Sequence, residues 1–212
     1  MRFTTFAAAA LAGAFISAPA AADVTQQDER GFVTRDVAVV EATPKEVWLA
    51  LITPSTWWNS AHTWSGDSAN LMLRPQAGGC FCERIPEAED GDSITLEGSV
   101  EHMRVIQSYP ERAMRLTGAL GPLQSEAVTG VLTIAISQVD EGTLIVWEYS
   151  VGGRMRYEIP VISKSVDGVM SQQLAGLANL LGRVGAPPSA DEPEAEEPSS
   201  VDEAFDGLSE GR

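Results

Sequence analysis

A run of strand-length segments leads into a single long helix, and this order leaves the chain few possible folds. Residues 71–152 divide into segments rich in β-branched and aromatic residues, and each segment ends at Gly, Pro or an Asp-Glu-Gly turn. Residues 164–185 instead place apolar side chains at helical spacing along one stripe. Because strands and helix are segregated along the chain, the order predicts an α+β fold rather than a parallel α/β fold.

The start of the folded part adds a strand and a short helix. Residues 32–42 are rich in Val and predict a strand. Thr43 follows at an N-cap position, with Pro44 at the first helical position and Glu46 completing a capping box. Pro54 ends this helical region. We therefore expect short helices after the first strand and a curved antiparallel sheet wrapped around the long C-terminal helix, which alone is large enough to cover that sheet.

The N-terminal residues 1–22 have the layout of a secretory signal peptide. Arg2 precedes an apolar run over residues 6–16, and small residues then offer cleavage after Ala20 or Ala22. This apolar run is too short to cross a bilayer, which needs roughly 20 apolar residues. The sequence predicts an exported protein, periplasmic or secreted, with no membrane span.

The C-terminal residues 186–212 are strongly acidic. From Pro187 onward the chain has nine acidic residues and one Arg, and the whole chain carries a formal net charge of −16. Such a segment cannot bury enough apolar surface to fold, so we expect a disordered tail. The folded part is acidic as well, which argues against a nucleic-acid partner, because phosphate binding requires a basic surface. A protein partner for the tail is not identified.

Several motifs together resemble one superfamily. They are VAVVEATPKEVWLALITPSTWW, GGCFCERI, GSVEHMRVI and VDGVMSQQLAGLANLL. The chain is similar to the START-like, or SRPBCC, superfamily over about residues 31–182, and we expect a START-like domain at 31–185 after an N-terminal lead at 23–30. Within it, the match is nearest to the polyketide cyclase/dehydrase or Hsp90-ATPase-activator-like group. The resemblance implies a helix-grip fold around an apolar cavity, whose guests range from lipids and plant hormones to polyketides.

Cys80 and Cys82 are the only cysteines and lie two residues apart on a predicted strand. Alternation puts both thiols and Arg84 on one face of that strand, and Phe81 and Glu83 on the other. An oxidising compartment allows a disulfide, but residues two apart on an extended strand lie roughly 6.6 Å from each other, at the limit of disulfide geometry. Such a bond would be labile rather than structural, and the sequence leaves the redox state of the pair open. We expect both side chains to line the inner face of the sheet.

Aromatic residues predict the walls of a binding site for a small hydrophobic molecule. Three tryptophans follow the first helix, and alternation puts Trp147 and Tyr149 on one strand face with Ile145 and Val151. The same side chains would serve equally well as ordinary core packing. The predicted ligand-binding residues are Trp57, Trp58, Trp64, Cys80, Cys82, Trp147, Tyr149, Met170 and Leu174.

No strong catalytic motif is found in the chain. It has neither a G-x-S-x-G nucleophile elbow nor a phosphate-binding loop, so we expect no nucleotide or other cofactor. Proton transfer would fall to His102 and Arg104, which strict alternation places on one face, although an outer face would make them merely solvated. His102 is also a possible partner for a Cys2His metal site, but no spacing requires one, and we predict no metal.

We therefore expect an exported START-like domain that binds or carries a small hydrophobic ligand in an internal cavity. A cyclase- or dehydratase-like enzyme acting on a hydrophobic substrate in the same cavity is the alternative. A second alternative is an interaction protein that acts through its acidic tail.

Overall fold

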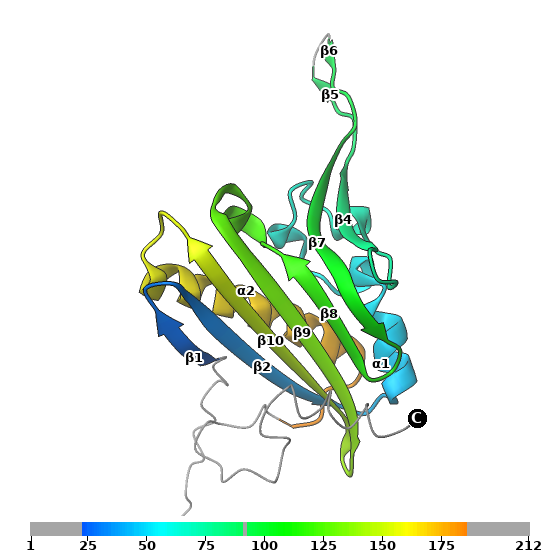
Figure 1. Ribbon diagram of the computed structural model, residues 1–212. Coiled ribbons are helices and arrows are strands. Elements are labelled where there is room, and N and C mark those ends of the chain that lie inside the picture. The colour runs from blue at the N-terminus through cyan, green and yellow to red at the C-terminus, as the bar shows by residue number, and fades with distance from the viewer. Residues whose placement is uncertain (1–22, 91–92, 186–212) are drawn as a thin grey trace, which may run out of the picture.

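An antiparallel sheet of eight strands and two α-helices make up the structure, a computed structural model that describes residues 23–90 and 93–185 (Figure 1). The strand order is β1-β2-β10-β9-β8-β7-β4-β3. The predicted signal peptide and acidic tail lie outside the described residues. The strands are β1 (Asp23–Asp28), β2 (Gly31–Val40), β3 (Leu71–Leu73), β4 (Cys80–Ile85), β7 (Gly98–Tyr109), β8 (Ala113–Gly118), β9 (Ala127–Val139) and β10 (Gly142–Arg154).

A narrow two-stranded ribbon projects from the sheet between β4 and β7 (Figure 1). It consists of β5 (Glu89–Asp90) and β6 (Ser93–Ile94), which pair only with each other. Short 3-10 turns complete the chain at η1 (Pro54–Thr56), η2 (Ser60–His62), η3 (Ser68–Asn70) and η4 (Gly121–Ser125).

The first helix, α1 (Pro44–Leu51), has the predicted capping box. The Thr43 hydroxyl accepts a hydrogen bond from the backbone N–H of Glu46 at 3.4 Å, and the Glu46 carboxylate accepts from the N–H of Thr43 at 2.8 Å. Two otherwise unpaired N–H groups are thereby satisfied, which fixes where the helix begins. The box and the Pro44 position are both confirmed.

The long helix, α2 (Ile159–Leu180), lies across one face of the sheet, against β2 and β1 (Figure 1). It begins earlier than residue 164, at Ile159, because Pro160 fits the first turn of a helix, where its missing N–H is not needed. No helix in the described part of the chain is both long and apolar enough to cross a membrane. The predicted helix-grip α+β architecture is confirmed.

The sheet has a regular half and a bulged half. In the regular half (β2, β10 and β9), the pairing runs without any register shift, and buried and less buried residues alternate strictly along β2. In the bulged half (β7 and β4), the pairing of β7 slips at His102 and again at Ile106. An extra residue bends its strand and changes the faces of the residues around it.

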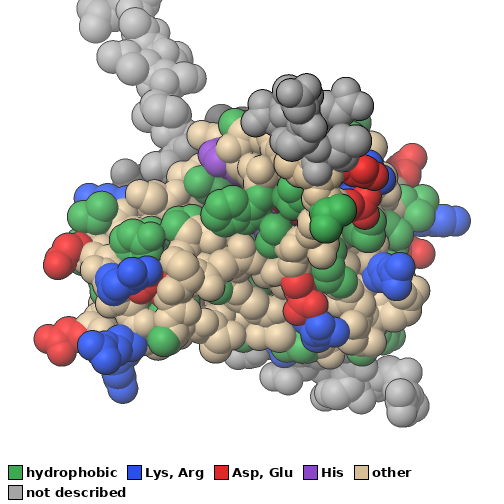
Figure 2. All heavy atoms as spheres, turned by 90° about the horizontal axis from the view of Figure 1, so that it is seen from above, with side chains coloured by type: hydrophobic (Ala, Val, Ile, Leu, Met, Phe, Trp, Pro, Cys, Tyr) green, Lys and Arg blue, Asp and Glu red, His purple; other side chains and the backbone are tan. Residues whose placement is uncertain are grey.

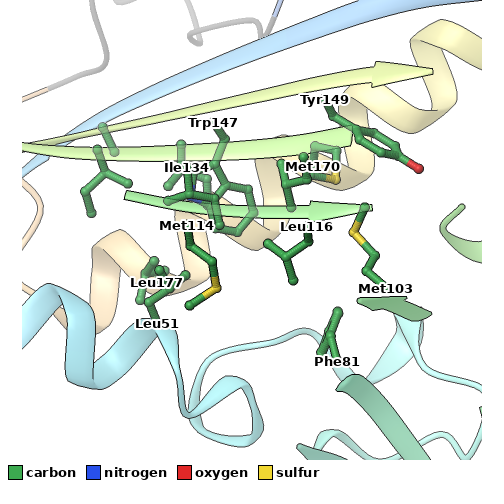
Figure 3. Packing of buried hydrophobic residues seen from close by; sticks show 14 of the residues in the cluster. Leu51, Phe81, Met103, Met114, Leu116, Ile134, Trp147, Tyr149, Met170 and Leu177 are labelled. Carbon is green, nitrogen blue, oxygen red and sulfur yellow. The ribbon is translucent and has the colours of Figure 1, made fainter. Parts of the chain in front are cut away.

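The core lies between the inner face of the sheet and the two helices (Figure 3). Burying one large apolar side chain of this kind contributes roughly 1.5–3 kcal/mol. Tyr149 illustrates how closely it is packed: a Cβ added to Gly130 would lie 2.4 Å from the Tyr149 ring, so only glycine fits beneath the ring. Large members of the core are Leu51, Phe81, Met103, Met114, Ile134, Trp147, Tyr149, Met170, Leu174 and Leu177.

Candidate functional site

An aromatic row crosses the interior from β10 to β7. The ring centroids of Trp147 and Trp57 lie 5.9 Å apart, and those of Trp57 and Trp58 lie 5.6 Å apart. The row continues through Phe81, 5.3 Å from Trp58, to His102, 5.1 Å from Phe81. These spacings are those of interacting rings. Five rings from four parts of the chain therefore form one continuous row.

The loop after α1 is fixed so that Trp57 and Trp58 point inward. The Trp57 indole N–H donates to the carbonyl of Ala50 at 2.8 Å, and that of Trp58 donates to the carbonyl of His62 at 3.1 Å. A Cβ at Gly176 of α2 would lie 2.5 Å from the Trp57 carbonyl oxygen. The missing side chain of Gly176 thus lets this loop approach the helix closely.

Gln173 of α2 also holds this loop, although it is polar and fully buried. Its side-chain oxygen accepts a hydrogen bond from the backbone N–H of Asn59 at 2.8 Å, and its nitrogen lies 2.8 Å from Nδ1 of His62. Nδ1 must then accept, because the amide nitrogen has only hydrogens to donate. A buried polar residue with both ends satisfied joins helix and loop at low cost.

Beneath α2, four polar side chains form a polar floor: Thr34, Asp36, Trp147 and Tyr149. Trp147 is the cross-strand partner of Asp36, and Tyr149 is the partner of Thr34, so all four share the inner face. The Tyr149 hydroxyl accepts from the Leu120 N–H at 3.2 Å. Within residues 23–90 and 93–185, the Thr34 hydroxyl and the Trp147 indole nitrogen have no hydrogen-bond partner, and both are buried.

Asp36 is the acidic member of the polar floor. Its carboxylate accepts a hydrogen bond from the Ser171 hydroxyl of α2 at 2.7 Å. Burial raises the pKa of Asp36 to about 6, and the negative charge of nearby Asp167 adds to this rise, against the lowering effect of the Ser171 bond. A carboxyl group with this pKa changes charge near the lower end of physiological pH. Burial also raises the pKa of Tyr149, which therefore stays protonated.

At the other end of the aromatic row, His102 and Glu83 form a buried pair, with Nε2 of His102 2.9 Å from the Glu83 carboxylate. Glu83 also accepts backbone hydrogen bonds from Trp64, at 3.0 Å, and from Ser65. Burial acts to raise the pKa of Glu83, but these hydrogen bonds outweigh it and the pKa is lowered. Burial lowers the pKa of His102, with Glu83 opposing that change. An ionised Glu83 thus anchors the loop at residues 64 and 65.

The expectation that His102 and Arg104 share a face is wrong. The register slips at His102, so that His102 and Met103 are both buried, whereas Arg104 is exposed on the outer face. Arg104 forms an ion pair there with Glu101 and donates to the carbonyl of Gly78 at 3.1 Å. The physical reason is the bulge, which breaks the two-residue alternation.

The expectation that Cys80 and Cys82 line the inner face is also wrong. Cys80 and Cys82 form a disulfide, and their Cα atoms lie 5.4 Å apart, closer than on a fully extended strand. The predicted alternation of β4 is correct, but Phe81 and Glu83 are the buried residues and the cysteines are on the outer face. The bulge opposite β4 shows that this part of the sheet departs from ideal strand geometry.

The other predicted ligand-binding residues divide between core and surface. Trp64 is 58% exposed, and its indole N–H donates to the Gln124 side chain at 3.2 Å. The remaining ones are brought together in the core: Trp57, Trp58, Trp147, Tyr149, Met170 and Leu174. Sequence reasoning missed Thr34 and Asp36, although both have the inner parity of the first strand, and it missed the role of Gln173.

The surface also has an apolar region. Figure 2 shows hydrophobic side chains gathered in a band across the middle of one end of the molecule, with most Lys, Arg, Asp and Glu side chains toward its edges. Trp64 and Met72 are among the large hydrophobic residues that the described part of the chain exposes.

Comparisons with known proteins show no family for this chain. No family model matches the chain, and no curated protein matches it. Solved structures similar to it include a protein from Mesorhizobium loti, with 17% identity, a TM-score of 0.45, and coverage of 70% of this chain and 96% of that one. A protein from Nitrosomonas europaea has 12% identity, a TM-score of 0.47, and coverage of 74% and 97%. The Aha1 dimer from Colwellia psychrerythraea has 12% identity, a TM-score of 0.42, and coverage of 70% and 95%. None of these assigns a function.

Proposed function

We propose that the protein binds a small, largely apolar molecule between α2 and the inner face of the sheet, and that this molecule carries at least one hydroxyl or carbonyl oxygen. The observation that carries the proposal is the pair of buried polar atoms on the polar floor that have no partner among the described residues, Oγ1 of Thr34 and Nε1 of Trp147. Buried polar groups in folded proteins are nearly always hydrogen-bonded, so each exception needs an explanation.

The energetics favour a polar ligand atom at this place. A buried donor left unsatisfied costs roughly 1–3 kcal/mol. A ligand oxygen that accepts from the Trp147 N–H and exchanges a hydrogen bond with Thr34 would recover much of that cost. The aromatic row, Met170 and Leu174 supply apolar surface for the rest of the molecule. Sites with apolar walls and a few placed polar groups are typical of small-molecule binding.

The charge of the polar floor restricts the chemistry of the ligand. At neutral pH, Asp36 is mostly ionised, because its pKa is about 6. A ligand carboxylate would be repelled there, since like charges in a buried site oppose each other strongly. We therefore infer a neutral head group. The START-like resemblance and the signal peptide predicted for residues 1–22 point to a guest of the cell envelope, such as a lipid or a quinone.

The test is a titration with Nile red, a neutral polarity-sensitive dye that bears a carbonyl group, followed by native mass spectrometry of the purified chain for a co-purified guest. Thr34→Val and Trp147→Phe each remove a hydrogen-bonding group while keeping an apolar side chain. We expect each to weaken dye binding about 2- to 10-fold, the loss of one hydrogen bond. Trp64→Phe is the matched control, because Trp64 is exposed.

The dye titration and the mass spectrometry distinguish ligand binding from its absence. Saturable dye binding that weakens in both inner variants and not in the Trp64 control supports the proposal. Absence of saturable binding together with absence of any co-purified mass would refute it, as would equal weakening in all three variants.

A cyclase- or dehydratase-like reaction in the same space is the alternative, and the buried His102–Glu83 pair at the end of the aromatic row favours it. A carboxylate that orients a histidine is a common arrangement in acid–base catalysis. In that case, His102→Gln would abolish conversion of the bound guest while Nile red binding persisted. Unchanged conversion in that variant would exclude a proton-transfer role for His102.

A further inference from the structure

A cluster of three metal-ligating side chains lies on the outer face of the sheet: Cys80, Cys82 and Glu101. One ligand atom from each lies within 4.8 Å of the other two, and the Cys80 sulfur is 3.9 Å from a carboxylate oxygen of Glu101. The two cysteines are half-buried and Glu101 is exposed. These atoms are accessible from solvent, and the packing of the core does not use them.

The bulge at His102 creates this cluster. Cys82 is paired with Glu101 and Cys80 with Arg104, because His102 is the extra residue between those two pairs. The cysteines are two residues apart, whereas Glu101 and Arg104 are three apart. Without the extra residue, Cys82 could not be paired with Glu101 while Cys80 is paired with Arg104. The backbone of Glu101 is further held by Gln124, whose amide donates to the Glu101 carbonyl at 2.8 Å. Tertiary structure thus fixes the carboxylate beside the two sulfurs.

We propose that the Cys80–Cys82 disulfide is reducible in the folded protein, and that the reduced pair binds one thiophilic divalent cation, such as Zn²⁺, together with Glu101. Zinc takes thiolates at about 2.3 Å and carboxylate oxygens at about 2.0–2.2 Å in a tetrahedral arrangement. Ligand atoms around one ion would then lie roughly 3.5–3.8 Å apart, which follows from those bond lengths. The Cys80–Glu101 distance is close to this geometry, and reduction allows the sulfurs to separate.

The redox step is balanced by a dithiol. Its two S–H bonds break and its two sulfurs join, while the Cys80–Cys82 bond breaks and each cysteine sulfur gains one electron and one proton. The cation then displaces both thiol protons. The disulfide is half-buried on the outer face of the sheet, so a small reductant can reach it, and disulfides accessible to solvent are more often labile than fully buried ones. The two cysteines are separated by only two positions in sequence, so loss of the bond removes little constraint from the unfolded chain.

Local charge suits a divalent ion. Two thiolates and the Glu101 carboxylate carry three negative charges, while one cation and the Arg104 guanidinium carry three positive charges. Arg104 donates to Oε2 of Glu101, the same oxygen that lies 3.9 Å from the Cys80 sulfur, so a cation bound there would share this oxygen with the guanidinium. Arg104 therefore orients the carboxylate in the way that residues around a metal site commonly do. The cluster lies on the face of the sheet opposite the polar floor, so this proposal is independent of the proposed function.

The experiment uses the full chain. One sample is reduced with a water-soluble phosphine, which is oxidised to the phosphine oxide with water supplying the oxygen and the protons, and a second sample is left oxidised. Both are desalted and titrated with Cd²⁺, and binding is followed by the cadmium–thiolate absorption band and by metal content per chain. We expect one ion per reduced chain and none on the oxidised chain.

Variants assign the ligands. Cys82→Ser should abolish the absorption band, and Glu101→Gln should weaken binding about tenfold or more. Glu97→Gln is the matched control, since Glu97 is an equally exposed carboxylate that pairs with Arg84 at 3.6 Å. A disulfide that resists the phosphine until the protein unfolds would overturn the proposal. So would equal uptake by oxidised and reduced chains, or an unchanged band in Cys82→Ser.

Discussion

The regular and bulged halves of the sheet are both antiparallel, but their strands pair differently. From Thr143↔Val40 to Gly152↔Gly31, β10 and β2 pair without a slip, and their inner residues form the polar floor beneath α2. In β7, the bulge turns His102 and Met103 to the same side and leaves Glu101 and Arg104 outside. In the regular half, the polar residues of the polar floor all lie on the inner face. In the bulged half, the polar residues around the bulge lie on both faces of the sheet.

In both halves, buried polar groups should affect stability more strongly than exposed ones. Asp36 and Glu83 are buried, so their charges are little screened, whereas the Arg104–Glu101 pair is about half exposed. Water and salt weaken exposed pairs. Four predictions test this gradient.

The largest effect is expected for Glu83→Ala in the bulged half. It leaves His102 and the backbone N–H groups of Trp64 and Ser65 without their acceptor in a buried place. The free energy of unfolding in urea should fall by about 3–5 kcal/mol. Glu83→Gln, which keeps one acceptor oxygen, should lose less. A loss under about 1 kcal/mol for the Ala variant would show that the loop does not depend on Glu83.

The next effect is the pH dependence of Asp36→Asn in the regular half. The folded-state pKa is raised from 3.8 to about 6, so the wild-type chain loses stability as pH rises through that window. The loss amounts to about 3 kcal/mol. The substituted amide cannot ionise and can still accept from Ser171, so the variant should gain stability relative to wild type as pH rises from about 4 to about 7. Parallel stability curves for the two chains would contradict the raised pKa.

A smaller effect of opposite sign is expected for Thr34→Val, without added ligand. The hydroxyl of Thr34 is buried and has no partner among the described residues, so replacing it with a methyl group removes a desolvated polar atom at nearly constant volume. The variant should be equally stable or more stable by about 1 kcal/mol. A clear loss in thermal or urea unfolding would show that the hydroxyl is satisfied in solution, for instance by a bound water.

The smallest effect is expected for Arg104→Ala on the outer face. It breaks an exposed pair with Glu101, and such pairs contribute about 0.2–1 kcal/mol. Unfolding at low and at high salt should therefore differ little from wild type, and any difference should shrink with salt. A loss comparable to that of Glu83→Ala would erase the distinction between the two faces of the bulged half.

Alternation in the sequence predicts the regular half well. Ile145, Trp147, Tyr149 and Val151 were expected on one face, and all four belong to the main core. Leu144 and Val146, expected on the other face, are buried in a separate small cluster. The prediction succeeds because a strand with continuous pairing keeps its two-residue period. The same rule, applied to Thr34 and Asp36, would have identified the polar floor, but polar residues within a strand are ordinarily taken as solvated.

The bulged half could not be predicted in this way. Neither Glu101 nor His102 is a residue type that marks a bulge, and the slip becomes visible only when β7 pairs with β4. The burial of Glu83 could not be predicted either, since an acidic residue on a strand is mostly exposed unless distant groups form hydrogen bonds with it. Here the satisfying groups are His102 and the backbone of residues 64 and 65, which lie far from Glu83 in sequence.

The sequence by itself determined the order of elements, the capping box of α1, the apolar stripe of α2 and the inward face of β10, because these depend on residues close together in the chain. Only the tertiary structure decided which face of β4 is buried, that Cys80 and Cys82 are joined on the outside, and that Thr34 and Trp147 share an inner face where the described residues leave both unsatisfied. Those outcomes depend on register between strands, and register is a property of the pair rather than of either strand.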